Sequence, residues 1–345
     1  MHYKPLPIGV DNFEKLITKG YYYVDKSDFI KDLLDMKGDV NLFTRPRRFG
    51  KTLNMSMLQY FFEDMRNSKG ESIDNSGIFS GLRIMQAGEK YLSHMGKYPV
   101  ITLTLKAGKQ STFESAYKQL IWQIGMEFER HSYLLDSDMP EEVRKRYKGI
   151  LSGNGEMDTF KASIQFLSNC LERYYEKKVI ILIDEYDVPL ENAFVCGFYD
   201  EMIDFIRALF ESALKTNSSL DFAVITGCLR ISKESIFTGM NNLTVISILN
   251  GQYDEYFGFT DEEVRKLCDD YGLPHKYEVF KSWYDGYSFG RADVYNPWSV
   301  IQFMFDLQAN ENCYPKAYWA NTSSNSIVRE LIELADESIK AELEL

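Results

Sequence analysis

The chain has 345 residues, of which 45% are hydrophobic and 26% charged, the composition of a globular protein and not of a disordered or fibrous one. Its net charge of −12 argues against nucleic-acid binding by this portion alone, because non-specific binding depends on basic groups that neutralise phosphates. Five cysteines without Cys-x-x-Cys spacing and four dispersed histidines predict neither a disulfide framework nor a zinc site.

The sequence predicts no signal peptide and no membrane span. Its first residues lack a basic segment followed by an apolar one, and the apolar run at residues 179–183 is far too short to cross a bilayer. We therefore expect a cytoplasmic protein that does not enter a membrane.

Strand and helix patterns alternate along most of the chain. After a short helix at residues 25–34, strands are predicted at residues 39–44, 98–105, 178–184, 220–226 and 244–249. Helices are predicted at residues 53–65, 112–129, 159–175 and 199–216, and the polar residues 131–158 are expected to form a surface excursion. This alternation predicts an α/β fold with a mainly parallel sheet covered by helices.

The pattern changes after residue 250, where aromatic residues and Asn, Asp and Gly become dense. The remaining periodic stretches predict helices at residues 260–271, 277–283, 297–307 and 326–344. We expect two domains, residues 1–250 and a smaller helical one at residues 251–345. The aromatic residues of the second are interpreted as core more than as contact surface.

A phosphate-binding loop is predicted between the first strand and the helix that follows it. Gly50, Lys51 and Thr52 stand there in the Gly-Lys-Thr order of such loops, in the strand–loop–helix context that the motif needs. Backbone N–H groups at the start of a helix hold phosphates, Lys51 is expected to bridge phosphate oxygens, and the Thr52 hydroxyl is expected to ligate Mg²⁺. The nucleotide-binding residues are predicted to be Arg45, Pro46, Arg47, Arg48, Phe49, Gly50, Lys51, Thr52 and Leu53.

This loop departs from the usual G-x-x-x-x-G-K-[ST] pattern, because Arg45 occupies the position of the first glycine. The alternative interpretation is a basic turn before a capped helix. Three arginines so close together repel one another, so we expect at least one of Arg45, Arg47 and Arg48 to pair with an acidic side chain. The others would face bound phosphates or the C-terminal domain.

An acidic pair ends the apolar strand at residues 178–184. Burying a carboxylate is costly unless it meets a cation, so Asp184 is predicted to hold Mg²⁺ and Glu185 to activate the attacking water. This pair favours hydrolysis over transfer to a substrate. Asp187 adds a third acid that either tunes the site or lies in a solvated turn.

The next strand ends in Thr226, which we expect to sense the terminal phosphate of a bound nucleotide. Arg230, four residues later, either stabilises charge in the transition state or forms a local salt bridge, and the sequence leaves both open.

Six segments together resemble the bacterial predicted AAA-ATPase (AAA-ATPase-like) family, which is similar to the archaeal-type ATPases of the STAND group. The segments are YYVDKS at 22–27, RPRRFGKTL at 45–53, IDEYD at 183–187, TGCLRISKESIF at 226–237, WYDGY at 283–287 and YNPWS at 295–299. The resemblance covers nearly the whole chain and implies a P-loop NTPase. Members typically carry a C-terminal nuclease-like domain of the PD-(D/E)XK type, and no such domain is visible here.

The motifs and the resemblance predict an ATP-binding protein that uses Mg²⁺, either an ATPase or an ATP-driven switch. The first alternative is a module that binds ATP without hydrolysing it, which the arginine at position 45 favours slightly. The second is the regulatory half of a nuclease or other nucleic-acid enzyme. The sequence leaves an oligomer possible and does not identify a partner.

Overall fold

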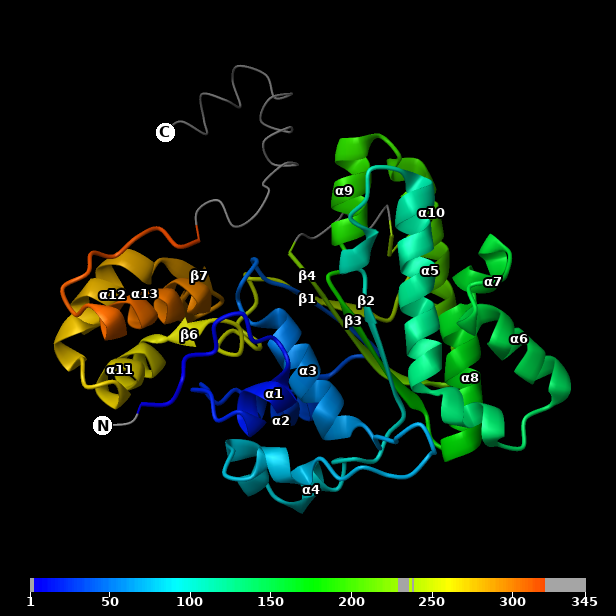
Figure 1. Cartoon of the computed structure of the whole chain (residues 1–345), viewed down its shortest axis with the longest axis horizontal. Helices are drawn as coiled ribbons and strands as arrows, with labels where there is room; N and C mark the ends of the chain where they lie inside the picture. The colour runs from blue at the N-terminus through cyan, green and yellow to red at the C-terminus, as the bar shows by residue number, and fades with distance from the viewer. Residues whose placement is uncertain (1–2, 229–235, 238, 320–345) are drawn as a thin grey trace.

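The computed structural model describes residues 3–228, 236–237 and 239–319. A five-stranded parallel sheet lies at the centre of the molecule (Figure 1). The strand order is β2-β3-β4-β1-β5, and every hydrogen-bonded pair is parallel. The strands are β1 (Val40–Thr44), β2 (Val100–Thr104), β3 (Val179–Asp184), β4 (Leu220–Gly227) and β5 (Leu243–Ile246). All five strands were predicted from the sequence, each within three residues at its ends.

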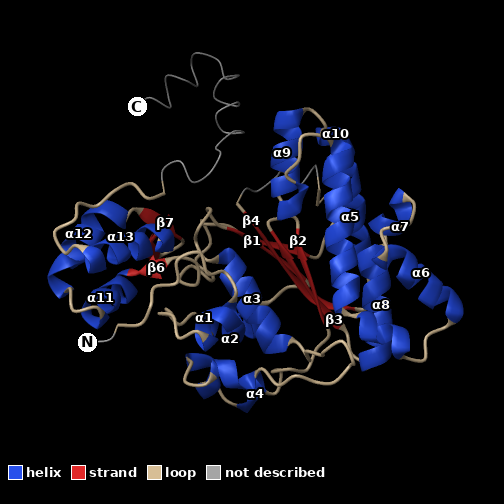
Figure 2. Cartoon of the chain, in the orientation of Figure 1, coloured by secondary structure: helices blue, strands red, loops and turns tan. Residues whose placement is uncertain are grey.

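Helices cover both faces of this sheet, as Figure 2 shows. One face packs against α1 (Phe13–Thr18), α2 (Asp28–Met36) and α3 (Lys51–Phe62), with α4 (Glu89–Leu92) beyond them. The other packs against α5 (Phe113–Arg130), α6 (Glu141–Leu151), α7 (Met157–Lys161), α8 (Ser163–Tyr175), α9 (Val188–Cys196) and α10 (Tyr199–Phe210). Successive residues of a strand point to opposite faces, so Ile180 and Leu182 join the first core and Ile181 and Ile183 the second.

Several of these helices were missed in the sequence, and α6 and α9 are the longest of them. Residues 131–158 were expected to be a polar surface excursion, but α6 buries Tyr147 and Ile150 against α5. Its apolar face is narrow and its remaining residues are charged, which hides the periodicity. Helix α9 begins directly after the acidic motif, where the sequence was interpreted only for its carboxylates.

The residues after 258 form a smaller assembly that contains a sheet as well as helices. Its helices are α11 (Asp261–Asp270), α12 (Tyr277–Tyr284) and α13 (Pro297–Ala309), close to the predicted positions. The prediction of helices alone was incomplete, because β6 (Phe259–Thr260), β7 (Tyr287–Phe289) and β8 (Ala292–Tyr295) form an antiparallel sheet in the order β6-β8-β7. The helix expected at residues 326–344 lies outside the described residues.

The two parts of the chain are closely joined. Leu6 from the N-terminal segment packs in the core of the helices α11–α13. The buried ammonium group of Lys26 contacts the carboxylate of Glu263 at 2.6 Å and also donates to the Glu255 carbonyl at 2.6 Å. Phe257, Phe289 and Val294 share a core with α2 and α3. The division into two domains at residue 250 stays a prediction. Residues before position 250 contact residues after it in both hydrophobic cores and through the Lys26–Glu263 ion pair.

No helix in the described part of the chain is both long enough and apolar enough to cross a membrane.

Candidate nucleotide site

The loop between β1 and α3 is held in an unusual backbone conformation. Gly50 precedes the first residue of α3 with φ of 79°, and Arg48 has φ of 69°. Both values lie in the left-handed region, which glycine enters freely and other residues enter at a cost. The loop therefore turns sharply before α3, as expected of a loop that presents N–H groups at a helix N-terminus.

Lys51 is buried inside this loop, with 6% of its surface exposed. Its Nζ atom donates to the carbonyl oxygens of Arg45 and Pro46, both at 2.9 Å, and lies 3.4 Å from the Cys228 sulfur. The ammonium group thus points into the turn of the loop, toward the C-terminal ends of β1 and β4.

Three oxygen-bearing side chains meet beside the loop. The Thr52 hydroxyl donates to Asp184 Oδ2 at 2.7 Å, and the Thr226 hydroxyl donates to Asp184 Oδ1. The strand order explains this meeting, since β4 lies between β1 and β3 and the C-terminal ends of parallel strands share one edge. The sequence alone placed these residues on three separate segments, and the fold brings them together.

This set of side chains fits a magnesium ion. Mg²⁺ prefers oxygen ligands and is usually held by one or two protein groups together with water and substrate phosphates. Thr52 and Asp184 are such groups. The described residues contain no group of three or more His, Cys, Asp or Glu side chains that could hold a metal by themselves. They fit an ion whose ligands come partly from a nucleotide.

Glu185 follows Asp184 with φ of 54°, so its side chain leaves the strand in a different direction. Burial raises the pKa of Glu185, as does the negative charge of Asp184, while Lys106 and Lys51 oppose the rise. A half-buried carboxyl group with a raised pKa is a stronger base when ionised, which suits a group that accepts a proton from water.

The Arg45 side chain points away from Lys51 and into the protein core, between the ends of β1 and β5 and the ring of Phe257. Its guanidinium group is fully buried and donates to the carbonyls of Thr44 and Ile246, both at 3.0 Å. The rings of Phe257 and Phe289 lie 5.1 and 5.3 Å from it, and burial lowers the pKa of Arg45 to about 10. Any contact of Arg45 with phosphates would therefore use its backbone.

The other two arginines leave the loop in different directions. Arg47 pairs with Glu191 of α9 at 2.6 Å, which confirms that one loop arginine meets an acidic side chain. Arg48 stacks on the indole ring of Trp298 at 3.8 Å from its centroid. The expectation that another arginine faces the C-terminal part of the chain is also confirmed.

The remaining predicted residues have distinct surroundings. Phe49 is fully buried and Leu53 is half-buried against the core that contains α1 and α3. Asp187 is 1% exposed and accepts a hydrogen bond from the Cys228 backbone N–H at 2.8 Å, so a solvated turn is the wrong interpretation of it. Arg230 lies outside the described residues.

Sequence reasoning missed four residues that contact or face the site: Lys106, Glu191, Cys228 and Trp298. Cys228 follows Thr226 and Gly227 at a strand end, a signal that was available in the sequence. Glu191 and Trp298 come from other elements, and only the tertiary structure shows their proximity.

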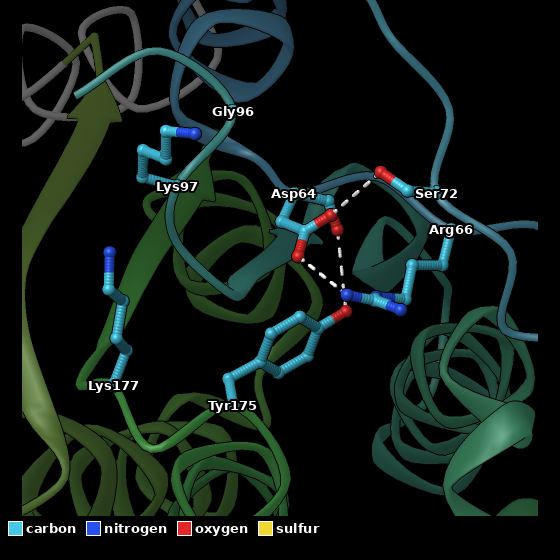
Figure 3. A pocket seen from close by; sticks show the side chains of 7 residues that line it. All are labelled: Asp64, Arg66, Ser72, Gly96, Lys97, Tyr175 and Lys177. Carbon is cyan, nitrogen blue, oxygen red and sulfur yellow. Dashed lines mark hydrogen bonds and ion pairs between the residues drawn. The ribbon is translucent and has the colours of Figure 1, made fainter. Parts of the chain in front are cut away.

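A separate open pocket of about 290 Å³ lies at the opposite end of the sheet (Figure 3). Its lining residues are Asp64, Arg66, Ser72, Gly96, Lys97, Tyr175 and Lys177. Lys97 and Lys177 precede β2 and β3, so this pocket faces the N-terminal ends of the strands. Ligands of open parallel sheets bind at the C-terminal ends, which favours the loop of Lys51 over this pocket.

The chain is similar to a curated protein and to a family of known sequences. A protein from Azotobacter chroococcum mcd 1, described as "Uncharacterized protein in vnfD 5'region", is 26% identical over 338 residues, which cover 96% of this chain and 57% of that protein. The chain thus spans little more than half the length of this relative. Neither similarity bears out the nuclease-like domain. The model of the family described as "Predicted AAA-ATPase" matches residues 7–237, which include the whole loop and the acidic strand, and the chain belongs to this AAA-ATPase-like family.

Proposed function

We propose that the chain binds ATP with Mg²⁺ at the loop of Lys51 and hydrolyses it to ADP and phosphate. Membership of the AAA-ATPase-like family supports ATP binding. The observation that carries the finer proposal is the cluster in which Asp184 accepts hydrogen bonds from Thr52 and Thr226, next to Lys51 and Glu185.

Each side chain has a distinct part in this proposal. Lys51 exchanges its loop carbonyls for phosphate oxygens, and the N–H groups at the start of α3 hold the same phosphates. Thr52 and Asp184 hold Mg²⁺, which neutralises phosphate charge when bound. Glu185 accepts the proton of the attacking water, and Thr226, hydrogen-bonded to Asp184, is placed to respond to the terminal phosphate.

The direct test is ATP binding by the Lys51→Ala variant. Loss of a buried charged contact weakens binding by about 2–4 kcal/mol, so calorimetry with ATP and Mg²⁺ should show a reduction of roughly 30- to 1000-fold. Lys148→Ala, which removes an exposed lysine of α6, is the matched control and should bind as the unchanged chain does. Equal affinity in Lys51→Ala and the unchanged chain would refute the loop assignment.

A second candidate function is regulation of a nucleic-acid enzyme by bound ATP with negligible hydrolysis. The observation behind it is that the relative is longer than the matched region, which covers 57% of it, so that protein has a further part that bound ATP would regulate. Steady-state phosphate release, measured with and without DNA, separates the two functions. Phosphate release, with or without DNA, supports the ATPase, whereas ATP binding without release in either condition supports the regulatory module.

A further inference from the structure

The phosphate loop is covered on its outer side by residues from the C-terminal part of the chain. The buried ring of Phe49 lies 4.9 Å from the ring of Tyr287 and 5.1 Å from that of Phe289, both in β7. A Cβ atom on Gly258 would lie 3.2 Å from the Phe49 ring, so a larger residue at position 258 would crowd the loop. The loop and the small antiparallel sheet are therefore packed as one unit.

Arg45 supports the loop from below through the same part of the chain. Besides its contacts with Thr44 and Ile246, its guanidinium donates to the Tyr253 carbonyl at 3.5 Å and lies near the rings of Phe257 and Phe289. This explains how the loop tolerates arginine where glycine is usual, because the side chain turns away from the phosphates into a pocket of carbonyls and aromatic rings.

Arg48 combines a strained backbone conformation with a stacked side chain. Its φ of 69° is unfavourable for a residue with a side chain. Without compensating contacts, this strain would lower the population of the loop conformation by a factor on the order of ten. The guanidinium stacks on Trp298 at 3.8 Å. Trp298 is itself fixed, since it stands in the first turn of α13 and its indole N–H donates to the Tyr318 carbonyl at 3.3 Å.

We infer that Trp298 is a positioning residue of the nucleotide site, acting on the phosphate loop through Arg48. The stacked guanidinium holds Arg48 in the left-handed conformation, which orders the loop two residues before Gly50 and prepares its N–H groups for phosphates. A preformed loop binds more tightly because it loses less conformational freedom on binding. This inference rests on the proposed ATP site and adds the C-terminal part of the chain to it.

The test is a double-mutant cycle with Trp298→Ala and Arg48→Gly, in which the affinity for ATP and Mg²⁺ is measured by calorimetry. Loss of a cation–π contact of this kind corresponds to roughly 2- to 30-fold weaker binding in Trp298→Ala. Trp298→Phe retains an aromatic face and should restore most of the affinity. Trp122→Ala, which removes an exposed indole of α5, is the matched control and should leave affinity unchanged.

Arg48→Gly separates backbone strain from the side-chain contact. Glycine adopts a φ of 69° without strain, so if backbone conformation alone mattered this variant would bind as well as the unchanged chain or better. We expect weaker binding instead, because an unstacked glycine leaves the loop free. Adding Trp298→Ala to Arg48→Gly should then cause no further loss, since the two residues act as one contact.

Thermal unfolding of each variant shows whether the fold is intact. If Trp298→Ala does not fold, Trp298→Leu, which keeps an apolar side chain but has no aromatic face, takes its place and should show the same loss of affinity. Equal losses from Trp298→Ala with and without Arg48→Gly would overturn the inference, as would unchanged affinity in Trp298→Ala while the unchanged chain binds ATP. No ATP binding by the unchanged chain would refute the proposed function, and the inference with it.

Discussion

Buried polar groups gather at both ends of the central sheet, but their charges are balanced in different ways. At the N-terminal end, Glu127 accepts hydrogen bonds from the Thr102 backbone N–H at 2.7 Å and from Arg130 at 2.6 Å. Arg130 also bonds to Glu63 and to the Val100 carbonyl. Burial alone would raise the pKa of Glu127, but Arg130 and His131 outweigh it and lower the pKa to about 2.

At the C-terminal end, Arg47 pairs with Glu191, but Lys51 and the acidic pair Asp184 and Glu185 are not paired with one another. Asp184 accepts hydrogen bonds from two hydroxyl groups, and Lys51 donates to carbonyl oxygens. Among the described residues no ion pair joins Lys51 to Asp184 or Glu185, and the pKa of Glu185 is raised by burial and by Asp184. We therefore propose that the N-terminal cluster stabilises the fold, whereas the C-terminal cluster serves to meet charges of a bound nucleotide and its metal.

The largest effect is expected on turnover, in the Glu185→Gln variant. Removing a general base lowers the rate by roughly 10²- to 10⁴-fold, while ATP binding should be retained because the shape of the side chain is kept. Phosphate release and calorimetry measure the two quantities. Glu201→Gln, an exposed change of the same kind in α10, is the control. If Glu185→Gln releases phosphate at the rate of the unchanged chain, Glu185 is not the base.

The next largest effect concerns stability, in the Glu127→Gln variant. This change removes the buried carboxylate of Glu127 and leaves half-buried Arg130 with one carboxylate fewer, which should lower the free energy of unfolding by about 3–5 kcal/mol at neutral pH. Urea unfolding at pH 7 measures it, with Glu129→Gln on the exposed side of α5 as the control. A loss of less than about 1 kcal/mol would mean that the N-terminal cluster is not essential to the fold.

The stability lost in Glu127→Gln should depend on pH, because it comes from the ionised form of Glu127. The pKa of Glu127 is depressed in the folded chain, so its ionised form contributes stability above the ordinary glutamate value of about 4.3. This contribution is lost as pH falls from there toward about 2. The difference in unfolding free energy between Glu127→Gln and the unchanged chain should therefore be full at pH 6–7 and shrink in acid. A constant difference across this range would contradict the ionic account.

The sequence predicted features that depend on neighbouring residues, and it missed features that depend on contacts between distant segments. The strands and the loop were predictable, because apolar runs such as 179–183 and the order Gly50, Lys51, Thr52 are local patterns. The N-terminal cluster was not predicted. Glu127 and Arg130 look like ordinary polar positions of an amphipathic helix, and only the packing of α5 on β2 shows that Glu127 is buried and Arg130 half-buried.

The same limit applies within the candidate site. That Asp184 ends a buried strand was evident, and it indicated a cation. The sequence could not place the Arg45 side chain beneath the loop or Trp298 against Arg48, because both depend on how residues after 250 pack on the first part of the chain. Small antiparallel strands such as β6, with two residues, are too short for a periodic pattern to reveal them.

The smallest expected effect is on the stability of the Asp184→Asn variant. The change in the free energy of unfolding should have the opposite sign to that of Glu127→Gln, so it distinguishes the two ends of the sheet. Asp184→Asn keeps the size of the side chain and can still bond to the hydroxyls of Thr52 and Thr226, while it removes a negative charge beside Glu185. Without nucleotide, the free energy of unfolding should stay the same or rise by about 0.5–1 kcal/mol, as is common when a charge that serves a ligand is removed.

The rise in unfolding temperature that ATP and Mg²⁺ cause in the unchanged chain should be reduced in Asp184→Asn, because the ligand stabilises only as far as it binds the folded state. Urea unfolding without nucleotide and thermal unfolding with it measure the two effects, and Asp200→Asn, exposed near the start of α10, is the control. A loss of several kcal/mol in Asp184→Asn without nucleotide, as large as that expected for Glu127→Gln, would show that the C-terminal cluster also holds the fold together. The distinction between the two ends of the sheet would then have no energetic basis.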